Sequence, residues 1–121
     1  MNPMPSTNAL TSARGYTTLR SLTVLADPST WQYTVQLVLA KSEAGDGLLA
    51  RVTFEDVSGF QAQDLGGGLT QLLLLVAEDC STEGLERIRF RVRELERNAL
   101  SLDCHSLRVE FASASNITPV A

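Results

Sequence analysis

Four arginines alternate with apolar residues in one short stretch of the chain: Arg87, Arg89, Arg91 and Arg93. The planar guanidinium group of arginine carries several N–H donors and favours contacts with carboxylates and phosphates. A β-strand would place these arginines on one face and the intervening apolar side chains on the other. We call the four residues the arginine row and predict that they bind an acidic surface of a protein partner.

The same stretch also fits a helix over residues 85–97, because apolar residues recur there at intervals of three and four. In a helix Arg87 and Arg91 would be like-charged neighbours and Phe90 would leave the apolar side, so we favour a strand. On a strand, carboxylates from adjacent strands can balance the arginines. The candidates for this balancing role are Glu55, Asp103 and Glu110.

Residues that commonly carry catalysis are few in this sequence. His105 is the only histidine, and the side chain of Cys104 beside it would point to the opposite face of a regular strand. Cys80 and Cys104 lack the paired spacing of a zinc site, so we expect two reduced, buried thiols. We therefore predict no catalytic residue, no metal and no cofactor. The alternative is a ligand-binding or enzymatic pocket formed by Arg91, Asp103 and His105.

The composition limits the classes of partner. With 121 residues, of which 44% are hydrophobic, the chain can form one core without metal or disulfide support. Its net charge of -4 argues against general binding to nucleic acids or anionic membranes, which requires a cationic surface. The longest apolar run, residues 72–77, is far shorter than the roughly 20 residues of a membrane-spanning helix. The N-terminus has no secretory signal pattern, so we expect a cytoplasmic protein.

Alternation of apolar and polar residues predicts most of the strands. Changes of parity predict irregularities near Asp56 and at His105 with its neighbour Ser106. The run over residues 72–76 is apolar on both parities, which favours a central strand covered on both faces. Trp31 and Tyr33 fit either a protein interface or the core. The expected strand segments are 19–26, 33–39, 50–57, 72–76, 87–93, 99–104 and 107–111.

These elements predict a mainly β fold, an antiparallel sheet or sandwich of about six to seven short strands with at most one short helix. We divide the chain into an N-terminal arm (residues 1–15), a single β-rich domain (16–112) and a C-terminal tail (113–121). The arm is rich in polar residues and proline, so we expect it to be mobile, with a short helical turn near residues 8–14. An exposed strand edge can pair with a second copy, so a self-associating structural protein and a homodimer are further alternatives.

Four segments in the second half of the chain form a recognisable pattern: Val52–Phe60, Glu78–Asp79, Phe90–Val92 and Leu100–Cys104. Together they resemble a group of small bacterial β-rich proteins, some of which are described as immunity-type proteins of toxin systems. The resemblance covers residues 30–111 and departs at Trp31, which is followed by Gln32 where an acidic residue is common in the group. It implies an antiparallel sheet and little chemistry. Because catalytic residues are missing and charge is concentrated in the arginine row, we expect a non-enzymatic protein–protein interaction domain, either immunity-type or an accessory factor.

Overall fold

The computed structural model describes residues 10–41, 47–80 and 88–113, and these contain a short helical turn at residues 10–12 and seven strands. All paired strands are antiparallel, which confirms the predicted mainly β fold. The strands are β1 (Thr18–Ala26), β2 (Tyr33–Ala40), β3 (Leu48–Ala62), β4 (Leu75–Asp79), β5 (Phe90–Glu94), β6 (Leu100–Cys104) and β7 (Ser106–Ser113).

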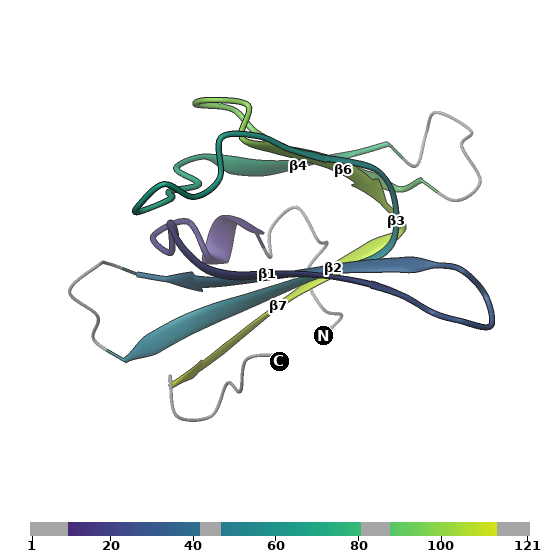
Figure 1. Cartoon of the computed structure of the whole chain (residues 1–121), viewed down its shortest axis with the longest axis horizontal. Coiled ribbons are helices and arrows are strands. Elements are labelled where there is room, and N and C mark those ends of the chain that lie inside the picture. The colour runs from purple at the N-terminus through teal and green to yellow at the C-terminus, as the bar shows by residue number, and fades with distance from the viewer. Residues whose placement is uncertain (1–9, 42–46, 81–87, 114–121) are drawn as a thin grey trace.

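The long strand β3 belongs to two layers. Its first half lies between β2 and β7, and its second half pairs with β6. One layer therefore has the strand order β1-β2-β3-β7, and the other has the order β3-β6-β5-β4. Figure 1 shows the two layers stacked, with β3 turning from one into the other at one end of the molecule.

Irregularities in two neighbouring strands produce this turn. Asp56 has a positive φ of 54° and is the extra residue where the register between β2 and β3 shifts. At the same level His105 separates β6 from β7, and its backbone N–H donates to the carbonyl of Glu55 at 3.0 Å. Because a bulge bends its strand, the two strands change layer together. The predicted irregularities near Asp56 and at His105 are confirmed.

The core lies between the two layers and is formed by the alternating apolar residues of their strands. Leu10 and Ala13 also belong to the buried apolar residues, and Figure 1 shows the N-terminal helical turn between the layers. These two residues come from the segment that we expected as an N-terminal arm, of which residues 1–9 lie outside the described residues. The most buried strand residues are Val35, Leu37, Val52, Phe54, Val92, Leu100 and Cys104.

The apolar run over residues 72–76 does not form the central strand that we expected. The strand β4 begins only at Leu75 and lies at an edge of its layer, where it pairs with β5 alone. Leu72 is buried before the strand starts, and its N–H donates to the carbonyl of Thr17 at 2.8 Å. The run is apolar because this connecting segment also packs on the core. Residues 81–87, between β4 and β5, and residues 114–121 of the expected tail lie outside the described residues.

Candidate partner-binding surface

Two residues of the arginine row, Arg91 and Arg93, belong to β5, which is paired on both sides by β4 and β6. The alternate residues of β5 are buried in the core, so Arg91 and Arg93 point outward. Arg89 lies just before the strand and is exposed, and Arg87 lies outside the described residues. The strand interpretation of this stretch is therefore confirmed for residues 90–94, and the helix alternative is wrong there.

Arg91 is held by a carboxylate on the neighbouring strand. Its Nε atom lies 3.4 Å from Oδ1 of Asp103, the residue paired with it on β6. On its other side Arg91 is paired in the sheet with Glu78 of β4, so it stands between two acidic positions. The predicted balance by Asp103 is confirmed. Because Arg91 is occupied in this way, Arg89 and Arg93 are the more exposed cations among the described residues of the row.

Glu55 and Glu110, the other two carboxylates expected to balance the row, lie on the other layer. Nη1 of Arg108 is 2.7 Å from Oε1 of Glu55, and Nη2 of Arg51 is 3.2 Å from Oε1 of Glu110. The pairing of β7 with the first half of β3 brings these four side chains together. Their assignment to the arginine row was therefore wrong.

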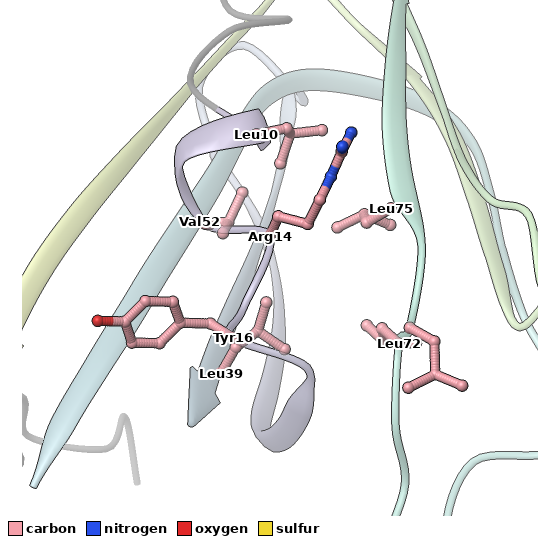
Figure 2. A pocket seen from close by; sticks show the side chains of 9 residues that line it. Leu10, Arg14, Tyr16, Leu39, Val52, Leu72 and Leu75 are labelled. Atoms are coloured by element: carbon pink, nitrogen blue, oxygen red, sulfur yellow. The ribbon is translucent and has the colours of Figure 1, made fainter. Parts of the chain in front are cut away.

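Arg91, Asp103 and His105 do not form the pocket that we considered as an alternative. Arg91 and Asp103 line a shallow groove of about 220 Å³ on the outer face of the second layer, whereas His105 is exposed at the turn between β6 and β7. A separate hollow lies between the N-terminal helical turn and the layers (Figure 2), and its volume of about 10 Å³ has room for about one water molecule. Figure 2 shows mostly apolar side chains around it, including Leu10, Leu39, Val52, Leu72 and Leu75.

Cys80 and Cys104 are both buried and form no disulfide, which confirms the expected thiols. Burial raises the pKa of the Cys104 thiol to about 12, and the carboxylates of Asp103 and Asp56 add to this effect. The thiol therefore stays protonated at neutral pH and is not a nucleophile.

Within the described ranges, no three His, Cys, Asp or Glu side chains are grouped as metal ligands. The same ranges contain no helix with the length and apolar character needed to cross a membrane.

Trp31 and Tyr33 lie on the surface, with 69% and 45% of their area exposed. Trp31 belongs to the β1–β2 loop, which is organised by the carboxylate of Asp27. This carboxylate accepts hydrogen bonds from the hydroxyl and N–H of Ser29, both at 2.8 Å, and from the N–H of Thr30 at 3.3 Å. The same bonds, led by that of the Ser29 hydroxyl, lower the pKa of Asp27. The loop holds Trp31 at a φ of 60°, a left-handed conformation that is rare for a bulky residue.

The fold and these surfaces define a small antiparallel β protein whose charged and aromatic side chains face outward. Comparison with protein families gives a more particular answer, because the family described as Immunity protein PIM8 matches residues 7–110. The chain belongs to this immunity protein family, which confirms the immunity-type resemblance of its sequence. Membership is consistent with a non-enzymatic, protein-binding role. Comparisons with curated proteins and with solved structures found no match.

Proposed function

We propose that this protein binds a toxin protein and neutralises it by occupying its surface, without catalysing a reaction. The observation that carries the proposal is the family match over residues 7–110, which includes every strand except the end of β7. The geometry supports the same role, since the hollows of about 540, 420, 360 and 220 Å³ among the described residues are open to solvent and their rims carry exposed side chains. We further propose that the protein acts in the cytoplasm.

We also propose that the arginine row, Arg87, Arg89, Arg91 and Arg93, faces an acidic patch of the toxin. Arg89 and Arg93 are exposed at the two ends of β5, while Arg91 between them is held by Asp103. Charges at the rim of an interface mainly accelerate association and determine its salt dependence. Arg89 and Arg93 should therefore affect the association rate more than the dissociation rate.

The test uses the proteins encoded by the two genes that flank the gene for this chain. We expect one of them to stop growth when it is produced alone, and we expect co-production of this chain to restore growth. In a titration of the purified proteins, neutralisation should be complete only at an equimolar ratio, since a binder acts stoichiometrically. Neutralisation by a small fraction of an equivalent, or the absence of a complex with either protein, would contradict the proposal.

The arginine row is tested with the double variant Arg89→Gln and Arg93→Gln. We expect slower association with the toxin and a weaker dependence of the rate on salt concentration. The matched control is the double variant Arg14→Gln and Arg20→Gln, which makes the same change of charge at exposed positions elsewhere. If both double variants associate at the same rate, the row does not contact the toxin.

A further inference from the structure

The β1–β2 loop lies at the end of the molecule where β3 turns between the layers (Figure 1). Large apolar side chains are exposed in this loop and on the strands beside it, including Val24, Trp31 and Tyr33. Two adjoining hollows open there, with volumes of about 420 and 360 Å³, and they share Val57 and Ser58 in their lining. The first hollow lies between β1, β2 and the second half of β3, and the second is lined by Trp31 of the loop, by β3 and by Ile88. We call this area the Trp31 surface, formed by Val24, Trp31, Tyr33, Val57, Phe60 and Ile88.

The backbone conformation at position 31 does not favour a tryptophan. Its positive φ is adopted far more readily by glycine or asparagine than by a bulky aromatic residue. Its side chain is also the most exposed of the large hydrophobic residues that the structure describes, so it contributes little to the core. The hydrogen bonds around Asp27 hold the backbone of the loop that presents this exposed side chain. Exposed tryptophan and tyrosine residues, here Trp31 and Tyr33 two positions apart in the chain, are typical of the residues that dominate binding energy in protein interfaces.

The charges around this surface indicate the chemistry of the partner. Asp56 is the charged residue among those described that line the two hollows, and Asp27 lies in the loop that carries Trp31. The face of an exposed indole ring also attracts cations. Acidic groups beside an apolar hollow are complementary to an apolar side chain that has lysine or arginine next to it.

The Trp31 surface is continuous with the arginine row, because Ile88 lines the second hollow and is followed directly by Arg89. An apolar, aromatic centre with charged residues at its margin is the usual arrangement of a protein–protein interface. We propose that the Trp31 surface is the centre of the toxin-binding interface and receives an apolar side chain of the toxin flanked by lysine or arginine, with the cation facing Asp56. This inference rests on the proposed function and names the surface and the partner chemistry that serve it.

A single experiment can observe this surface directly, because Trp31 is the only tryptophan of the chain. The chain is produced with 5-fluorotryptophan, so that its fluorine NMR spectrum contains one signal, and it is titrated with the unlabelled toxin identified by the flanking-gene test. We expect this signal to shift and broaden until an equimolar amount of toxin has been added. A signal that stays unchanged while the complex forms would overturn the inference.

The energetic role is tested with Trp31→Asn, which fits the left-handed φ. We expect toxin affinity to fall at least about 30-fold, the loss associated with an interface hot spot, while the melting temperature stays the same or rises. The matched control is Leu69→Asn, which removes another strongly exposed apolar side chain, 56% exposed, from the loop next to the other end of β1. Affinity of the control should remain within about twofold of wild type. Equal losses in both variants, or wild-type affinity in Trp31→Asn, would overturn the inference.

The partner chemistry is tested with Asp56→Asn, which keeps the shape of the side chain and tolerates the same φ. We expect slower association with the toxin and a weaker salt dependence, whereas faster or tighter binding would show that an acidic group faces this position and would overturn the stated chemistry. A fluorine shift that depends on concentration in the absence of toxin would assign the surface to a second copy of the chain instead. If the wild-type chain binds neither flanking protein, the proposed function is wrong. If a complex forms and Trp31 takes no part in it, only the inference about the Trp31 surface is wrong.

Discussion

Glu94 is a buried carboxylate whose removal should destabilise the second layer. Its side chain is 1% exposed, and its two oxygens accept hydrogen bonds from four backbone N–H groups. Oε1 accepts from Arg97 at 2.9 Å and Ala99 at 3.3 Å, and Oε2 accepts from Glu96 at 3.0 Å and Leu74 at 3.3 Å. The carboxylate thereby ties the β5–β6 loop to the segment before β4. Burial by itself would raise the pKa of Glu94, but the four donors outweigh it and hold this pKa below its ordinary value.

The variant Glu94→Gln should lower the free energy of unfolding by about 2–4 kcal/mol. The amide NH₂ group replaces one carboxylate oxygen and faces two backbone donors, which lose their acceptor. Each buried donor without an acceptor costs about 1–3 kcal/mol. Water can reach part of the loop because Glu96 and Arg97 are exposed, so we expect the lower half of the summed range. For a domain of this size the loss corresponds to a decrease in melting temperature of roughly 8–16 °C.

The assay is thermal and urea unfolding followed by circular dichroism, with Glu96→Gln as the control. The control makes the same chemical change at an exposed neighbour, so its stability should stay within about 0.5 kcal/mol of wild type. Because the pKa of Glu94 is lower in the folded state than its ordinary value of 4.5, the carboxylate stabilises the fold above that pH. This contribution is lost as the pH falls through the folded pKa, so the difference between wild type and Glu94→Gln should shrink in acid. Equal stability of the two variants at pH 7 would refute the reasoning.

Three further predictions concern the surface. Arg91 and Asp103 form an ion pair whose side chains are 30% and 29% exposed, so a double-mutant cycle with Arg91→Gln and Asp103→Asn should give a coupling of about 0.2–1 kcal/mol, and a coupling near zero would contradict the pairing. Asp27→Ala removes the acceptor that organises the β1–β2 loop, so acrylamide should quench the fluorescence of Trp31 more strongly, and unchanged quenching would show that other contacts hold the loop. Asp56→Ala should be less stable than Asp56→Asn in urea unfolding, because alanine adopts the left-handed φ less readily, and equal stability would show that the bulge does not depend on this residue.

The strands and their irregularities could be predicted because they depend on local alternation. The apolar parity of β3 changes between Phe54 and Val57, and this change located the bulge at Asp56. The pairing of charges could not be predicted in the same way. Glu55 and Asp103 are both acidic strand residues, and only the long-range pairing of β3 with β7 and then with β6 places them on different layers.

The prediction of a central strand over residues 72–76 was wrong because residues outside a strand can also be buried. Its apolar residues fit a strand covered on both faces, but part of the run precedes β4 and packs on the core together with Leu10 of the helical turn. The exposure of Trp31 could not be predicted either, because it also depends on packing between distant elements. The turn-forming residues after Ala26 could be recognised in the sequence, whereas the area of the indole that stays uncovered depends on which elements surround the loop.

The turn of β3 between the layers connects the fold to the proposed interface. Asp56 is both the bulge residue of this turn and the acidic residue of the Trp31 surface. A regular β3 would have no extra residue at this point, and its second half would continue in the first layer. The loop that carries Trp31 and the segment that begins at Ile88 would then no longer meet around a common hollow. The bulge at Asp56, together with the break at His105 beside it, therefore contributes both to how the two layers are joined and to how the apolar and charged parts of the proposed toxin-binding surface are placed.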